Sequence, residues 1–161
     1  MENHYASVIE SPIGKLTILA DDEFVHAVIF TETDIRDLTE NELTSKVALQ
    51  FEDYFKGKLK DFDFPIKQKG TDFQQQVWQN LIAIPYGETT SYAKFSKHHP
   101  LAIRAIAAAN GKNNIAIAVP CHRVIGSNGK LVGYAGGLWR KQWLLQHERE
   151  VAQKGQTTLK F

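Results

Sequence analysis

The sequence has a single cysteine, Cys121, and a single methionine in 161 residues. One cysteine excludes an internal disulfide and any metal site built from several cysteines. No run approaches the roughly 20 apolar residues that a membrane-spanning helix needs. The first residues, Met-Glu-Asn-His, include an acidic side chain and no apolar core, which is not typical of a secretory signal. We therefore expect a protein of the cytoplasm, where thiols stay reduced.

The two halves of the chain differ in charge although the net charge is only +1. Residues 1–70 carry 8 Lys and Arg against 14 Asp and Glu, whereas residues 71–150 carry 9 against 4. A basic second half suits a polyanionic partner. Solvated surfaces also vary in charge, so this difference alone decides nothing.

Alternating residues in the first half predict an antiparallel meander with strands over 5–10, 15–20 and 24–30. A helix is expected over 41–56, because Val47, Phe51 and Phe55 recur every four residues, and Gly57 is a suitable C-cap. Residues 58–70 lack a helical period and are interpreted as a partly packed linker. The expected domains are residues 1–70, an α/β domain of three strands and a helix, and residues 71–161.

The second half is expected to be mainly helical. Thr71 and Gln74 fit a capping box, and an apolar stripe from Phe73 to Ile84 ends before Pro85. A short helix capped by Thr89 or Thr90, a turn containing Pro100 and a helix over 101–110 have the outline of a helix-turn-helix.

Alanine makes up half of the predicted helix 101–110, which also carries Arg104. Small side chains let a helix approach another surface closely, although packing against a neighbouring helix or sheet explains them too. Asn128-Gly129 predicts a hairpin. A last helix is expected over 138–148, with Leu138, Leu144 and Leu145 facing inward, before a frayed polar tail from Val151.

Cys121 follows Pro120 and precedes His122 and Arg123, a setting that stabilises a thiolate. A lone cysteine can also be a small buried hydrophobe, and His122 can be a core histidine. A nucleophilic cysteine needs a histidine that is itself oriented, and Glu148 is a carboxylate that could orient it. His98 and His99 lack a third ligand at suitable spacing, so no metal site is expected.

The order of motifs in the second half carries a specific resemblance. The segments are PYGETTSYA at 85–93, AIRAI at 102–106, Asn113, PCHRVIG at 120–126, GYAGGL at 133–138 and LLQHE at 144–148. Over about residues 70–150 the chain closely resembles the O6-alkylguanine-DNA alkyltransferases, also called methylated-DNA–protein-cysteine methyltransferases. The resemblance implies an α/β N-terminal domain that folds as a ribonuclease H-like roll, followed by a mainly α-helical C-terminal domain with a helix-turn-helix.

This resemblance implies a role for each matching residue at the reacting centre. Cys121 is the alkyl acceptor, and His122 and Glu148 are the water-linked pair that removes the thiol proton. Asn113 braces the cysteine turn. Tyr92 donates a proton to the departing guanine and helps rotate the nucleotide outward.

The resemblance also implies how DNA is held. Arg104 takes the place of the extruded base in the stack, and Ala105 and Ser127 belong to the DNA-binding surface, which enters the minor groove. Main-chain groups of Cys121, Val124 and Ala135, together with the ring of Tyr134, line the base pocket. Ala116 stands where some members have proline, which suggests a roomier pocket that accepts alkyl groups larger than methyl.

The implied function is direct-reversal repair of double-stranded DNA that contains O6-alkylguanine, with O4-alkylthymine as a second substrate. The base must be flipped out of the stack before the thiolate can reach its alkyl group. The thioether is not reversed, so each monomer acts once, without cofactor or structural zinc. Two alternatives remain at this stage. One is a non-reacting damage sensor, a type that usually lacks the cysteine, and the other is a cysteine hydrolase, which leaves Arg104 unexplained.

Overall fold

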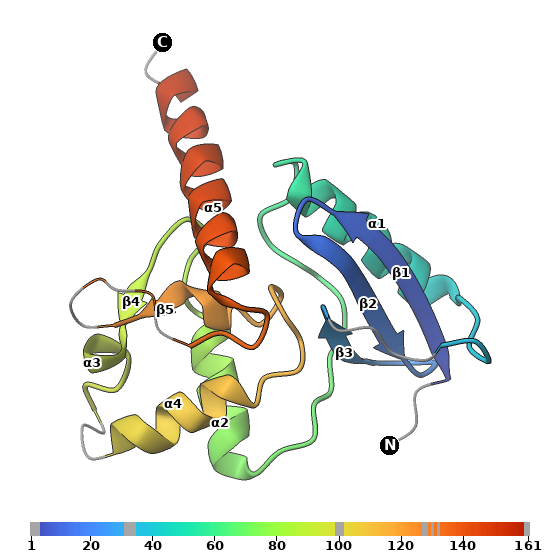
Figure 1. Cartoon of the computed structure of the whole chain (residues 1–161), viewed down its shortest axis with the longest axis horizontal. Coiled ribbons are helices and arrows are strands. Elements are labelled where there is room, and N and C mark those ends of the chain that lie inside the picture. Colours follow the sequence, from blue (N-terminus) through green and yellow to red (C-terminus); the bar gives the residue numbers. More distant parts are fainter. Residues whose placement is uncertain are drawn as a thin grey trace. The chain divides into compact units, whose positions relative to one another are not determined.

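The structure is a computed structural model that describes residues 4–30, 35–98, 102–126, 129, 131 and 133–159, with side chains to residue 154. The chain separates into two compact units, which Figure 1 traces. Unit 1 comprises Met1–Lys69 and Asn114–Ala118, and unit 2 comprises Gly70–Asn113 and Val119–Phe161. None of the helices in the described ranges is long and apolar enough to cross a membrane.

Unit 1 is built on the predicted meander. Strands β1 (Tyr5–Ser11), β2 (Gly14–Ala20) and β3 (Val25–Ile29) form an antiparallel sheet in the order β1-β2-β3. The first turn ends at Gly14, whose φ of 106° is available to glycine at little cost. Every residue from Leu16 to Ala20 is buried, so both faces of the middle strand are covered.

Helix α1 (Glu42–Phe55) lies along β1 and β2 (Figure 1). Asn41 caps it by accepting a hydrogen bond from the Thr44 backbone, and the Thr44 hydroxyl accepts one from the Asn41 backbone. Val47, Phe51 and Tyr54 are buried toward the sheet. The helix therefore forms where the four-residue spacing predicted it.

The interpreted linker contributes to the core of unit 1. The rings of Phe62 and Phe64 lie 4.6 and 6.0 Å from the ring of Phe51. Ile66 pairs with Val25 in a parallel bridge. Residues 114–118 also belong to this unit, although they lie far along the chain. They bond to strand β3: the Val28 N–H donates to the Asn114 carbonyl at 2.8 Å, and the Ala116 N–H donates to the Val28 carbonyl at 3.0 Å.

Unit 2 begins with helix α2 (Asp72–Ile82), capped by the predicted box of Thr71 and Gln74. It packs beside α4 (Ile103–Gly111), where the Trp78 indole donates to the Ala109 carbonyl at 2.9 Å. Val77, Leu81 and Ile84 are buried, but Phe73 is 41% exposed at the start of the predicted stripe.

Three predictions about the remaining helices were wrong. The short helix α3 (Tyr92–Phe95) is capped by Ser91 and not by Thr89 or Thr90, because Thr90 and Ser91 form strand β4, which pairs with β5 (Val124–Ile125), and the helix begins only after them. Helix α5 (Leu138–Leu159) runs past Glu148, because residues 149–154 contain neither proline nor glycine and include several strong helix formers. Leu138 is 48% exposed, whereas Leu144 and Leu145 are buried as expected. Pro100, Asn128 and Ser127 lie outside the described residues.

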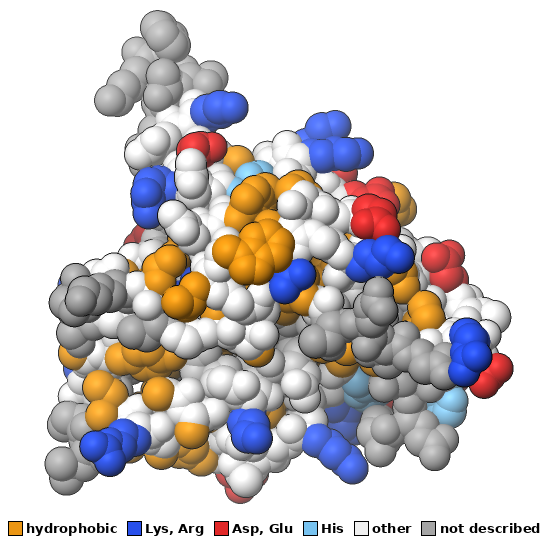
Figure 2. All heavy atoms as spheres, in the orientation of Figure 1, with side chains coloured by type: hydrophobic (Ala, Val, Ile, Leu, Met, Phe, Trp, Pro, Cys, Tyr) orange, Lys and Arg blue, Asp and Glu red, His pale blue; other side chains and the backbone are white. Residues whose placement is uncertain are grey.

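The unequal distribution of charge is visible on the surface. On the face in Figure 2, acidic side chains gather over α1, which carries the exposed Glu42, Glu52 and Asp53. Hydrophobic side chains show over α2 and α4 on the same face, and these two helices carry one basic side chain between them, Arg104. Other basic residues of the second half lie on α3 and α5, namely Lys94, Arg140 and Arg149.

Candidate active site

Cys121 lies in a turn that is held on both sides. The Asn113 side chain donates to the Val119 carbonyl at 2.9 Å, and the Cys121 N–H donates to the same carbonyl at 2.8 Å. Pro120, with φ −82° and ψ 63°, gives this segment the geometry of an inverse γ-turn. A single 3₁₀ turn, Cys121–Arg123, follows and leads into β5. The turn fixes the thiol, which is only 8% exposed.

His122, Arg123 and Glu148 form a buried network beside the cysteine. The His122 Nε2 lies 2.8 Å from Glu148 Oε2, and both side chains are at most 1% exposed. The Arg123 guanidinium donates to both carboxylate oxygens of Glu148, at 2.8 and 3.1 Å, and to the Ile84 carbonyl at 2.7 Å. The carboxylate therefore bridges a cation and an imidazole away from water.

The charges in this network determine the histidine tautomer. Burial raises the pKa of Glu148, but the hydrogen bonds from His122 and Arg123 and the charge of Arg123 outweigh it and hold that pKa well below the usual range. Burial also lowers the pKa of His122, so the imidazole is neutral near pH 7. An ionised carboxylate only accepts hydrogen bonds, so Nε2 carries the imidazole proton. Nδ1, which is buried and has no partner among the described residues, is then a proton acceptor.

The thiol itself is protonated in this environment. Burial raises the pKa of Cys121, and it is opposed by a hydrogen bond from the Asn113 side chain and by the charge of Lys141. The expected help from Arg123 is absent, because its guanidinium is directed to Glu148 and Ile84. Reaction at sulfur therefore needs a base, and His122 is the adjacent candidate.

Lys141, and not Arg123, is the cation that lowers the pKa of the Cys121 thiol. Its side chain is fully buried, and its Nζ donates to the Val124 carbonyl at 2.7 Å. Burial lowers the pKa of Lys141, whereas a thiolate at Cys121 would raise it. The residue thus places a positive charge within electrostatic reach of the sulfur.

A cavity of about 240 Å³ lies in unit 2, lined by Tyr92, Ala107, Asn110, Gly111, Gly133, Tyr134 and Ala135. Burial raises the pKa of Tyr92 and raises that of Tyr134 well above its usual value, and negative charge on Cys121 would raise both further. The two hydroxyls therefore stay protonated near pH 7, and Tyr92 can act as a proton donor. Val124 and Ala116, both predicted for the pocket, are not among the described residues that line this cavity; Ala116 pairs with Val28 in unit 1 instead.

The exposed face of α4 consists of Arg104 and small side chains. Arg104, Ala105, Ala107 and Ala108 are exposed, while Ile106, Ala109 and Asn110 face inward. Ala109 therefore packs inward, as one interpretation of the alanines predicts, and the exposed alanines leave the other interpretation, close approach of another surface, as a prediction. Ser127, the other residue predicted to contact DNA, lies outside the described residues.

Gly87 shows how the segment after Pro85 approaches α5. Its φ is 80°, and its N–H lies 3.4 Å from Glu148 Oε1. A Cβ at this position would come within 3.0 Å of the Ala152 Cβ. Glycine is needed here for both backbone conformation and space.

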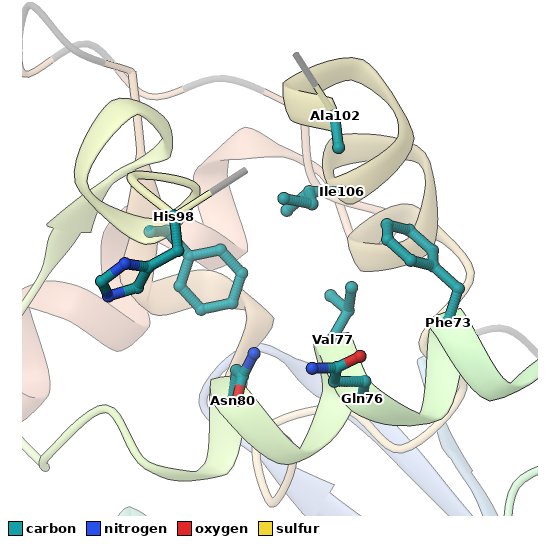
Figure 3. Close-up of a pocket in the computed structure, with 8 residues that line it drawn as sticks. Phe73, Gln76, Val77, Asn80, His98, Ala102 and Ile106 are labelled. Carbon is teal, nitrogen blue, oxygen red and sulfur yellow. The ribbon is translucent and has the colours of Figure 1, made fainter. Parts of the chain in front are cut away.

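A larger cavity, about 460 Å³, lies between α2, α4 and the residues after α3 (Figure 3). Phe73, Gln76, Val77 and Asn80 point into it from α2, opposite Ala102 and Ile106 of α4. It is lined by none of the residues around the thiol, whereas the smaller cavity is lined by Tyr92 and Tyr134, whose pKa values a thiolate at Cys121 would raise. Over the described ranges, no three His, Cys, Asp or Glu side chains are grouped to hold a metal ion.

Comparison with known proteins identifies the family. The model of the "6-O-methylguanine DNA methyltransferase, ribonuclease-like domain" matches residues 4–68, and that of the corresponding "DNA binding domain" matches residues 72–150. A methylated-DNA–protein-cysteine methyltransferase from Methanosarcina acetivorans is 44% identical over 152 residues, covering 89% of this chain and 97% of the relative. The chain belongs to the methylated-DNA–protein-cysteine methyltransferase family.

Solved structures of this methyltransferase family agree with the fold. The O6-methylguanine methyltransferase of Mycobacterium tuberculosis superposes with a TM-score of 0.81 at 42% identity, covering 91% of this chain and 93% of that one. A structure of the OGT protein of M. tuberculosis in complex with DNA gives a TM-score of 0.83 at 44% identity, covering 91% and 94%. The predicted fold class, a small α/β domain followed by a helical DNA-binding domain, is confirmed.

Sequence reasoning missed Lys141 and Asn110 and misplaced Arg123. The position of Arg123 in the chain predicts that it faces the thiol, but neighbouring side chains often diverge, and its guanidinium contacts Glu148 instead. Lys141 lies seven residues before Glu148, so helical periodicity alone places both on one face of α5. No sequence pattern predicts that Asn110 is buried, because a single polar residue at the end of an alanine-rich helix is also typical of a solvent-exposed position.

Proposed function

We propose that this protein repairs alkylated DNA by transferring the alkyl group of O6-alkylguanine, and of O4-alkylthymine, irreversibly to Cys121. The observation that carries the proposal is the buried pair of His122 and Glu148, whose tautomer leaves Nδ1 as an acceptor with no partner among the described residues, on the residue that follows the only cysteine. The family supplies the substrate class, since its members are named for transfer from methylated DNA to protein cysteine.

The proposed reaction is a displacement at the alkyl carbon. The Cys121 thiol loses its proton through a bridging water to His122 Nδ1, while Glu148 and Arg123 stabilise the imidazolium that results. The sulfur forms a bond to the alkyl carbon as the bond from carbon to O6 breaks. Tyr92 donates a proton to the departing guanine. The thioether and the neutral base are the products, and no metal or other cofactor is needed.

The proposal gives each of the two expected domains its own role. Residues 71–161 bind DNA and transfer the alkyl group, and residues 1–70 support them. Arg104 and Ala105, exposed on α4, face the minor groove together with Ser127, and Arg104 fills the space of the flipped base. Tyr134 and Ala135, which line the smaller cavity, form the base pocket with Val124, and Asn113 keeps the cysteine turn in place.

The protein is proposed to act as a monomer on double-stranded DNA. We place it in the cytoplasm, because the named relatives come from archaea and bacteria, whose chromosomes lie there. Binding to the DNA is expected to weaken as salt concentration rises, because lysine and arginine contacts to phosphates displace counterions.

Substitution of the acceptor separates binding from chemistry. The Cys121→Ala variant is expected to bind a duplex containing O6-methylguanine with unchanged affinity, because the thiol contributes little to DNA contact, and to transfer no methyl group. Affinity is measured by fluorescence anisotropy and transfer by loss of the modified base. Persistent transfer by this variant would contradict the assignment of Cys121. Binding without transfer by the unaltered protein would instead indicate a damage sensor, and the absence of both would leave the hydrolase alternative.

A further inference from the structure

Asn110 is an unusual residue for its position in α4. It is only 6% exposed, in a helix whose neighbouring residues are mostly alanine. Asparagine has a lower helix propensity than alanine, so it weakens the helix unless its side chain makes an interaction. Its Nδ2 is fully buried and makes no hydrogen bond of ordinary geometry to any described residue. A buried amide donor that lacks an acceptor is costly, so a hydrogen bond that forms to it is worth more than one at the surface.

The position of Asn110 shows what lies within its reach. Asn110 lines the 240 Å³ cavity together with Tyr92 and Tyr134. Burial raises the pKa of Tyr92, a thiolate at Cys121 would raise it further, and hydrogen bonding to the Asn110 amide opposes both. The amide of Asn110 and the hydroxyl of Tyr92 are therefore neighbours at the wall of the cavity.

We propose that Asn110 is a positioning residue for Tyr92, donating a hydrogen bond from Nδ2 to the Tyr92 hydroxyl oxygen when a base occupies the cavity. The inference rests on the proposed function. A tyrosine hydroxyl has one proton and can also accept hydrogen bonds. When Asn110 donates to the oxygen, the hydroxyl proton is left to point at the base.

The same contact stabilises the product of proton transfer. As the bond from O6 to the alkyl carbon breaks, Tyr92 gives its proton to the guanine and becomes a phenolate. The Asn110 N–H then donates to a charged oxygen, which makes a stronger hydrogen bond than a neutral one. The phenolate recovers its proton from solvent after the base leaves. Asn110 thus acts on the leaving group through Tyr92 without touching the alkyl carbon.

A double-mutant cycle tests this role. Single-turnover transfer from an O6-methylguanine duplex is measured at saturating DNA for the unaltered protein, Asn110→Ala, Tyr92→Phe and the double variant. We expect Asn110→Ala to slow transfer about tenfold and Tyr92→Phe about 100-fold or more, since a general acid contributes at least that much. The double variant should be no slower than Tyr92→Phe alone, because Asn110 has no hydroxyl proton to direct in that background. The DNA dissociation constant should not change with Asn110→Ala.

Controls keep the outcome interpretable. Alanine is the best helix former and already dominates α4, so Asn110→Ala should fold; a thermal melt checks this, and Asn110→Leu, which fills the space, serves as a second variant. Asn80→Ala, at an exposed position of α2, is the matched control and should transfer at the normal rate. Additive losses in the double variant, or no loss in Asn110→Ala, would overturn the proposal while the proposed function stands. Absence of transfer by the unaltered protein would overturn both.

Discussion

Among single substitutions that preserve side-chain shape, Glu148→Gln is expected to cause the largest loss of stability and of transfer rate. Glutamine removes the charge that Arg123 and His122 share, and leaves the Arg123 guanidinium buried without a counterion. Breaking a buried ion pair in this way typically costs about 3–5 kcal/mol of unfolding free energy. Transfer should also slow by about 100-fold, because the imidazolium formed at His122 loses its partner. Chemical denaturation and single-turnover kinetics measure the two effects.

Glu150→Gln is the control for this substitution. Glu150 lies on the same helix, is exposed, and has only a surface hydrogen bond with Gln146. Its replacement should change stability by less than about 0.5 kcal/mol. Replacing Arg123 by glutamine in the Glu148→Gln background should restore part of the stability, since it removes the uncompensated charge. Equal stability of Glu148→Gln and Glu150→Gln would mean that the buried network is not what holds α5 to the cysteine turn.

The same network makes stability depend on pH in a defined direction. The folded pKa values of His122 and Glu148 both lie below their unfolded values, so the unfolded chain binds more protons at acidic pH. The stabilisation is complete above about pH 6.5, and declines first as His122 becomes protonated in the unfolded state and then below about pH 4.3 through Glu148. In the Glu148→Gln variant, the second decline should disappear from denaturation curves recorded across this range.

The Lys141→Met variant is expected to lose activity with little loss of stability. Methionine has a similar length and suits a buried site, so relief from burying a charge offsets the lost hydrogen bond to Val124. The charge of Lys141 lowers the pKa of the Cys121 thiol, so its removal should raise that pKa. Transfer should slow by about tenfold or more near pH 7 and recover at higher pH. Single-turnover rates recorded against pH measure this shift of the rate profile to higher pH.

Lys112→Met is the matched control, because Lys112 is exposed just after α4. Its removal should leave the pH profile unchanged, although DNA affinity can fall slightly if it contacts a phosphate. An unchanged profile for Lys141→Met would show that Lys141 serves only to hold the Val124 carbonyl. A melt of each variant separates such a structural effect from an electrostatic one.

Local patterns predicted the elements that depend on local causes. The meander, the helix that begins near Asn41 and the box of Thr71 and Gln74 each rest on residues within a few positions of one another. Motif order placed Cys121, His122 and Glu148, and the structure brings the last two together across 26 residues. These contacts could be expected because the family resemblance carried them, not because spacing required them.

The errors arose where partners far apart in the chain decide the outcome. Ser91 rather than Thr90 caps α3, because both residues pair with β5 and the helix begins only after them, at Tyr92. The guanidinium of Arg123 turns from the neighbouring thiol to Glu148, a choice set by the fold of α5. The packing of Phe62 and Phe64 on Phe51 turned an expected linker into part of a core. No pattern confined to one segment contains this information.

The central claim is that Cys121 takes the alkyl group and keeps it. The most direct measurement is the mass of the intact protein, and of its Cys121 peptide, after incubation with excess duplex containing O6-methylguanine. We predict a gain of one methylene-sized increment, confined to the Cys121 peptide, that reaches one per molecule and does not turn over, with no gain in Cys121→Ala. Release of the methyl group from the modified DNA with no change in the mass of that peptide would contradict the account.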